Sequence, residues 1–98
     1  MVYEVRIAPA AERAIGKPSA PVQVAILDKL EELAEDPRPA NCEKVRELAQ
    51  YGVFRARVGK DYRILYQIKD QTTWILVLKV GDRKEIYERL ADLKRLLK

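Results

Sequence analysis

The clearest fold signal in the chain is the segment Phe54-Arg55-Ala56-Arg57-Val58-Gly59-Lys60-Asp61-Tyr62-Arg63-Ile64-Leu65-Tyr66. Apolar and basic side chains alternate on both sides of residues 59–61, and a β-strand shows successive side chains to opposite faces. The alternation therefore predicts two antiparallel strands joined by a turn. One face of this hairpin is apolar and the other is cationic.

The length of the turn decides which side chains share a face. A two-residue turn would mix apolar and basic side chains on one face, whereas a three-residue turn places Val58 opposite Tyr62 and Arg57 opposite Arg63. The buried face then carries Phe54, Ala56, Val58, Tyr62, Ile64 and Tyr66. The other face carries Arg55, Arg57 and Arg63, and like charges side by side on a sheet cost about some tenths of a kcal/mol per pair unless an anion lies between them. We therefore predict a rigid cationic platform for a polyanion, with RNA phosphate as the natural candidate.

Length and composition restrict the chain to one small domain. Its 98 residues are 48% hydrophobic and 35% charged, which suits a single modest core, and we expect residues 1–98 to form one domain. No apolar run approaches the roughly 18 residues of a membrane span, and the first residues lack the layout of a secretory signal. The only cysteine is Cys42. We therefore expect a cytoplasmic protein with no membrane partner.

Positive charge is concentrated in the second half of the chain. Residues 1–50 carry 7 basic and 9 acidic side chains, whereas residues 51–98 carry 12 and 6, a net charge of −2 against +6. This asymmetry favours an anionic partner, which is either a nucleic acid or an acidic protein segment.

The first forty residues predict a strand and two helices. Alternation over residues 3–7 indicates a short strand with one buried face. Pro9 opens a helix over residues 9–15, and Gly16 ends it with a positive φ. Ser19 or Ala20 caps a second helix, which ends at Asp36-Pro37. The residues at helical spacing on its buried face are Val22, Ile26, Leu30 and Leu33.

The rest of the chain predicts a short helical turn, three antiparallel strands and a last helix. The turn covers residues 42–49 and is held by Val45 and Leu48. Breaks at residues 59–61 and 70–72 separate the three strands. The last strand, residues 73–80, is apolar at almost every position, so we expect it to be central and covered on both faces. Its pattern does not assign a face to Trp74; we expect this side chain in the core, with stacking on RNA as the alternative. The terminal helix is marked by Ile86, Leu90, Leu93 and Leu97.

Two motifs resemble a known family of toxins. The first is the stretch from Phe54 to Ile68, and the second is Val77-Leu78-Lys79-Val80-Gly81-Asp82-Arg83-Lys84-Glu85-Ile86-Tyr87. Together with the length and the order of elements, they resemble the RelE/ParE toxin superfamily and its RelE-like branch. The resemblance implies an α+β fold, β-α-α-β-β-β, in which an antiparallel sheet packs against an N-terminal helical hairpin and a C-terminal helix follows. This is the RelE-like microbial RNase fold.

The resemblance also implies a function and a site. It implies the toxin of a type II toxin-antitoxin system, a ribosome-dependent mRNA endoribonuclease (mRNA interferase) that cuts mRNA in the decoding site, inhibits translation and is neutralised by a cognate antitoxin. The catalytic residues that it carries over are Arg55, Arg57, Arg63, Arg83 and Tyr87. We expect Lys60, Lys79 and Lys84 to contact RNA. The sequence departs from the family pattern at two positions, since relatives often have histidine in place of Asp82 and many lack Lys60 in the turn.

Metal-free RNA cleavage uses the neighbouring 2′-hydroxyl as the nucleophile, and arginine suits the neutralisation of the phosphorane. Arginine is a poor base, because its pKa lies above about 12. Tyr87 can take the proton if surrounding cations lower its pKa, and a lysine with a depressed pKa is an alternative. If neither is well tuned, positioning and charge stabilisation supply the rate. Without histidine or carboxylates at ligand spacing, we expect no metal and no cofactor.

Other interpretations remain open at this point. Taken singly, Arg63 can pair with Asp61 or Asp70, Arg83 can cap carbonyls, and Tyr87 can be the edge of the core. Two alternatives concern the function. The chain can be a ParE-like protein that inhibits DNA gyrase without catalysing a reaction, or a degenerate member that only binds antitoxin or RNA. The partners that we expect are an antitoxin with an acidic amphipathic segment, the ribosome and mRNA, with operator DNA only through the antitoxin complex.

Overall fold

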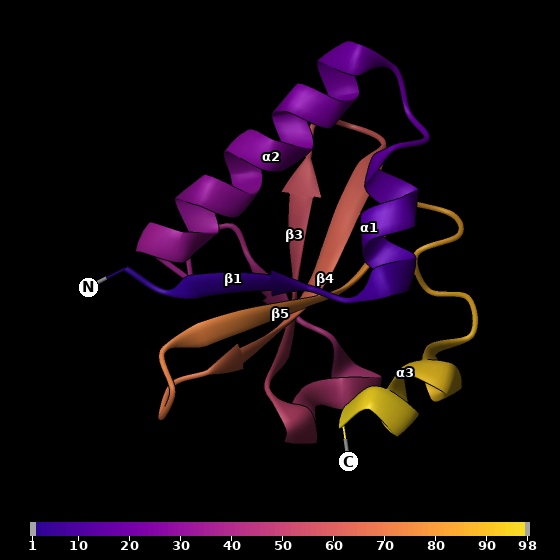
Figure 1. Cartoon of the computed structure of the whole chain (residues 1–98). Coiled ribbons are helices and arrows are strands. Elements are labelled where there is room, and N and C mark those ends of the chain that lie inside the picture. The colour runs from indigo at the N-terminus through magenta and orange to yellow at the C-terminus, as the bar shows by residue number, and fades with distance from the viewer. Residues whose placement is uncertain (1, 98) are drawn as a thin grey trace.

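The computed structural model describes residues 2–97, which form a five-stranded sheet with helices on both faces (Figure 1). The strands are β1 (Glu4–Ile7), β2 (Glu43–Lys44), β3 (Val53–Val58), β4 (Tyr62–Lys69) and β5 (Trp74–Asp82). The helices are α1 (Pro9–Ile15), α2 (Ala20–Glu35), the 3-10 helix η1 (Arg46–Tyr51) and α3 (Leu90–Leu97). None of the helices within residues 2–97 has the length and apolar character needed to cross a bilayer.

The sheet has the order β1-β5-β4-β3-β2. The register predicted for the β3–β4 hairpin is confirmed, because Val58 pairs with Tyr62 and Arg57 pairs with Arg63. β4 and β5 are antiparallel, whereas β1 returns from the first segment of the chain to pair in parallel with β5. β5 is therefore an internal strand, as its apolar sequence predicts.

One face of the sheet packs on the helical hairpin of α1 and α2. This first core contains the hairpin residues Phe54, Ala56, Val58, Ile64 and Tyr66, with Tyr62 partly buried against it. The hydroxyl of Tyr66 is buried and donates to the carbonyl of Pro37 at 2.7 Å. Burial raises the pKa of Tyr66. The hairpin face that the sequence predicted to be buried therefore packs in the core.

The opposite face is only partly cationic, which corrects the division into one apolar and one basic face. A second core covers its lower part, because η1 and α3 pack there on strands β3, β4 and β5 (Figure 1). Its buried members are Val45, Leu48, Val53, Leu65, Leu78, Ile86, Leu93 and Leu97. The arginines emerge beside this second core and are not spread over a bare sheet.

The segment between α2 and β3 differs from the helical turn predicted over residues 42–49. Val45 and Leu48 are buried as expected. However, Glu43 and Lys44 form the edge strand β2, and the helical turn is a 3-10 helix that runs to Tyr51. Two residues are too few to show a strand period, so the sequence pattern carried no signal for β2.

Helix and strand ends account for the remaining corrections. Gly16 ends α1 with a φ of −78°, not in the left-handed region. α3 begins only at Leu90, because residues 83–89 form turns, although Ile86 is fully buried. Trp74 belongs to neither core, and the guanidinium carbon of Arg6 lies 4.3 Å from the centroid of its ring.

Candidate functional site

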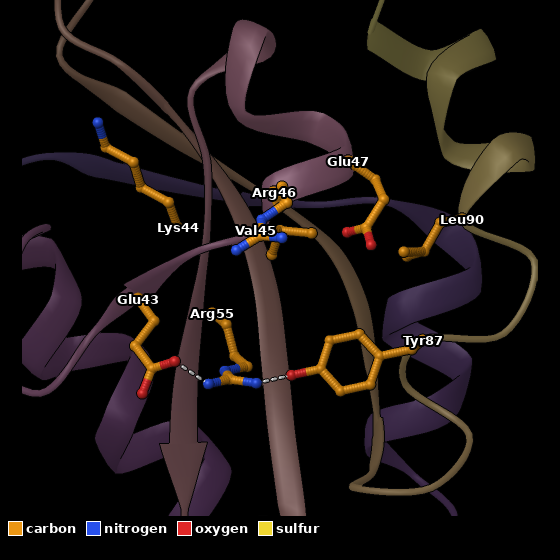
Figure 2. Close-up of a pocket in the computed structure, with 8 residues that line it drawn as sticks. All are labelled: Glu43, Lys44, Val45, Arg46, Glu47, Arg55, Tyr87 and Leu90. Carbon is orange, nitrogen blue, oxygen red and sulfur yellow. Dashed lines mark hydrogen bonds and ion pairs between the residues drawn. The ribbon is translucent and has the colours of Figure 1, made fainter.

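Three side chains from separate segments meet at Arg55 (Figure 2). Arg55 lies on β3 directly opposite Glu43 on β2, and its Nη2 donates to the Glu43 carboxylate. Its Nη1 donates to the hydroxyl of Tyr87, which comes from the turns after β5. The guanidinium carbon lies 5.6 Å from the centroid of the Tyr87 ring. One guanidinium thus holds a carboxylate and a phenol in fixed positions, and we call these three residues the Arg55 triad.

The Arg55 triad lines an open pocket of about 340 Å³. Figure 2 shows that its wall continues along residues 43–47 and is completed by Leu90. Small-ligand sites begin at about 300 Å³, so the pocket has room for part of a nucleotide. Its polar lining combines the arginines Arg46 and Arg55 with the carboxylates Glu43 and Glu47.

A second group of cations surrounds Arg63, two residue pairs further along the hairpin than Arg55. Arg57 and Arg63 are directly opposite each other on β3 and β4. Burial lowers the pKa of Arg63, and the nearby charges of Arg57, Arg55 and Arg83 lower it further. Arg63 therefore lies close enough to the other three predicted arginines for their charges to act on it.

The carboxylate pairs considered for Arg63 do not form. Its Nη1 donates to the carbonyls of Lys60 at 3.1 Å and Tyr62 at 2.9 Å. Asp70 instead accepts from Arg38, and no ion pair joins Asp61 to Arg63. Within residues 2–97, Arg55 alone among the four predicted arginines has a carboxylate partner. An incoming anion would thus meet three guanidinium groups that have no carboxylate in ion-pair contact, although the charge of Asp61 acts on Arg63 from a greater distance.

Asp82 has a structural part in the turn that follows β5. Its Oδ1 accepts from the backbone N–H groups of Lys84 at 2.9 Å and Glu85 at 2.8 Å. This pattern is a local cap of the kind that aspartate often makes at turns. The backbone N–H of Arg83 donates to the carbonyl of Asp61 at 2.6 Å, which joins this turn to the β3–β4 turn.

The three predicted lysines occupy different environments. Lys60 and Lys84 are exposed and form no ion pair in the described part of the chain. Lys79 is half-buried, and its Nζ donates to the carbonyl of Glu85 at 3.0 Å and to that of Glu88. Burial lowers the pKa of Lys79. Two of its three donors are therefore already used within the protein.

Sequence reasoning singled out Arg55 and Tyr87 but not Glu43 and Arg46, which line the same pocket. Glu43 is a single acidic residue that precedes an irregular segment. Nothing in the adjacent sequence distinguishes it from an ordinary solvent-exposed charge. Only its pairing with Arg55 across β2 and β3 brings it into the site. For metal ligation, residues 2–97 offer no group of three or more acidic or cysteine side chains.

Sequence comparisons show that this chain is similar to known toxins. A family model described as the ParE toxin of type II toxin-antitoxin system, parDE, matches residues 5–87 of this chain. Toxin RelG of Mycobacterium tuberculosis is 36% identical over 90 residues, which cover 91% of this chain and 100% of that protein.

Solved structures share the fold. In the crystal structure of the toxin-antitoxin complex RelBE2 from Mycobacterium tuberculosis, a chain with 33% sequence identity gives a TM-score of 0.73, with 85% of this chain and 100% of that chain covered. A mutant of the E. coli toxin RelE in the free state gives a TM-score of 0.80 over 100% of both chains. At 23% identity, this second likeness concerns the fold alone.

Proposed function

This chain belongs to the ParE toxin family of type II toxin-antitoxin systems, within the RelE/ParE superfamily, and from this premise we propose that it is a ribosome-dependent mRNA endoribonuclease that inhibits translation. The observation that carries the proposal is the group formed by Arg63 and the three arginines around it, joined through Arg55 to the hydroxyl of Tyr87. Like charges at this spacing destabilise a free sheet. A bound phosphate would relieve that repulsion, so the arrangement suits a site for the RNA backbone.

The proposed reaction breaks the RNA chain without a metal. The 2′-hydroxyl attacks the adjacent phosphorus, the bond to the 5′-oxygen of the next nucleotide breaks, and a cyclic phosphate and a 5′-hydroxyl result. Arg57 and Arg63 neutralise the charge that develops on the non-bridging oxygens, because a guanidinium binds such oxygens in pairs. Arg83 adds to this field from the turn after β5, and the exposed Lys60 and Lys84 hold the flanking phosphates.

Proton transfer is assigned to the oxygens of the Arg55 triad. Glu43 and Tyr87 both accept a hydrogen bond from Arg55, so one cation holds a carboxylate and a phenol in the same pocket. A carboxylate is a suitable acceptor for the proton of the 2′-hydroxyl, and a phenol can donate to the leaving oxygen. Relatives often have histidine at the position of Asp82, but with Glu43 and Tyr87 in these roles the proposed acid/base chemistry does not require it. Asp82 instead caps the turn that carries Tyr87.

The proposal includes a protein partner. Several chains with this fold were solved in toxin-antitoxin complexes, among them RelBE2 of Mycobacterium tuberculosis and the archaeal RelE-RelB complex of Pyrococcus horikoshii. We expect a cognate antitoxin whose acidic amphipathic segment covers the cationic surface, and operator DNA to bind only through that complex. The toxin acts in the cytoplasm, where ribosomes and mRNA are found. Purification of the two co-expressed proteins as one stable complex supports this part, and a toxin that purifies from such cells as a lone monomer contradicts it.

The decisive experiment combines induction of the toxin with mapping of ribosome-associated mRNA by primer extension. Wild-type toxin should give codon-phased cuts and arrest growth, and Arg63→Ala should abolish both while the protein stays folded. Arg13→Ala is the matched control, because Arg13 is an exposed arginine of α1, away from the site. DNA breaks without RNA cuts would instead identify a gyrase inhibitor. Normal growth with wild-type toxin at full expression would identify a degenerate member.

A further inference from the structure

We propose that Lys79 is a positioning residue: by binding the backbone carbonyls on both sides of Tyr87, it holds the phenol against Arg55. This inference rests on the proposed function for its catalytic consequence, but its structural content concerns the turn itself. Sequence reasoning had assigned Lys79 to RNA, and the structure gives its ammonium group a different use.

The position of Lys79 on the sheet brings it under the turn that carries Tyr87. Arg55, Leu65 and Lys79 form one row across strands β3, β4 and β5, because Arg55 pairs with Leu65 and Leu65 pairs with Lys79. Side chains in such a row point to the same face. Tyr87 reaches back over this row to Arg55. The turn is therefore bound at two points of the row: Lys79 binds its backbone, and Arg55 binds the hydroxyl of Tyr87.

The contacts of Lys79 are made to the backbone. Its Nζ lies 3.0 Å from the carbonyl oxygen of Glu85 and also donates to that of Glu88. These two residues flank Tyr87 in the chain. Hydrogen bonds from an ammonium group are stronger than those between neutral groups, and the half-buried position of Lys79 shields them from water.

The turn has no regular secondary structure, so specific contacts keep its shape. Residues 83–89 form no helix or strand, and Arg89 adopts a φ of 58°, in the left-handed region. Asp82 caps the start of the turn through the N–H groups of residues 84 and 85. Buried Gly81 leaves room for the Glu85 side chain, because a Cβ on Gly81 would lie 3.2 Å from it. Beyond Glu85, the side chain of Ile86 is buried in the second core and the hydroxyl of Tyr87 accepts from Arg55. Lys79 adds contacts from the sheet to the backbone of the turn itself, at Glu85 and Glu88.

Two backbone amides in the turn provide a measurement of this role. The N–H of Ile86 donates to the carbonyl of Asp82, and the N–H of Glu88 donates to that of Glu85, both at 3.0 Å. If Lys79 holds the turn, its loss opens these bonds while the sheet stays intact. Hydrogen exchange at Ile86 and Glu88 therefore measures the proposed role without any reference to activity.

The experiment compares purified full-length wild-type toxin with Lys79→Met, Lys79→Gln and Lys17→Met. Methionine keeps the aliphatic stem of Lys79 without the charge, glutamine keeps a donor, and Lys17 is an exposed lysine between α1 and α2 that controls for lost charge. We expect exchange at Ile86 and Glu88 to rise about tenfold or more in Lys79→Met, as the loss of one to two strong hydrogen bonds implies. A smaller rise is expected in Lys79→Gln and none in Lys17→Met.

Exchange at Ile86 and Glu88 that stays at the wild-type rate in Lys79→Met overturns the inference. If that variant loses protection throughout the sheet, Lys79→Gln decides in its place by the same criterion. Single-turnover cleavage supplies the catalytic readout: positioning lowers the cleavage rate and leaves the affinity for ribosome-bound mRNA unchanged, whereas lost affinity at an unchanged rate makes Lys79 a phosphate ligand and refutes positioning. If wild-type toxin cuts no RNA, the nuclease proposal fails, and the exchange rates still decide whether Lys79 holds the turn.

Discussion

Neutralising Arg57 should stabilise the free toxin while it abolishes RNA cleavage. Arg57 is exposed, lies directly opposite Arg63 and shares a face with Arg55, two residues away on the same strand. No ion pair or side-chain hydrogen bond of Arg57 is found within residues 2–97. Substitution with glutamine therefore removes repulsion without removing an attractive contact.

The size of the effect follows from the like-charge pairs that the substitution removes. Cross-strand charge pairs contribute about 0.2–1 kcal/mol each, so we expect Arg57→Gln to raise the free energy of unfolding by roughly 0.5–1 kcal/mol at low salt. For a domain of this size, about 4–8 °C of Tm corresponds to 1 kcal/mol, which gives an increase of roughly 2–8 °C. The screening length falls from about 30 Å at 0.01 M salt to about 3 Å at 1 M. The gain in stability should therefore largely disappear in 1 M salt.

Urea and thermal unfolding of the free toxin at the two salt concentrations measure this effect directly. Arg13→Gln is the control, because it removes the same charge from an exposed position on α1, away from the arginine group. The reasoning is refuted if Arg57→Gln is no more stable than wild type at low salt, or if its gain is equally large in 1 M salt. An equal gain in Arg13→Gln would show that net charge, and not the local arrangement, is responsible.

Three further predictions concern individual contacts. Glu43→Gln should slow mRNA cleavage by about a hundredfold or more, as loss of an acid/base group typically does, with the unfolding midpoint little changed; an unaltered rate removes Glu43 from the mechanism. Tyr66→Phe should lower the free energy of unfolding by about 1–2 kcal/mol, because the carbonyl of Pro37 loses its buried partner, and urea titration tests this. Asp70 has a pKa lowered to about 2, first by its hydrogen bond from Arg38, so its stabilising contribution is complete above about pH 4 and is lost as the pH falls toward 2. Acid unfolding of Asp70→Asn should lack this part of the pH dependence, and an unchanged profile contradicts the assignment.

Local alternation was sufficient to predict the hairpin and the arginine face. The odd length of the turn at residues 59–61 leaves one register that separates Tyr62 and Ile64 from the arginines, and the structure has that register. A one-residue slip would move every side chain to the opposite face. The proline starts of α1 and α2 and the stop after Glu35 were predictable for the same reason, because their signals lie within a few residues of the element.

Which arginines share a face followed from residue order alone, because the two-residue period of a strand and the length of the turn are both local properties. Long-range packing sets which other groups reach these arginines. Glu43 joins Arg55 because a two-residue edge strand pairs there, and Lys79 turns away from solvent because the turn after β5 folds back over it. These contacts join segments that lie more than a few residues apart in the sequence and that include irregular backbone, which has no side-chain period. The packing of η1 and α3 on the sheet therefore sets the positions of these segments.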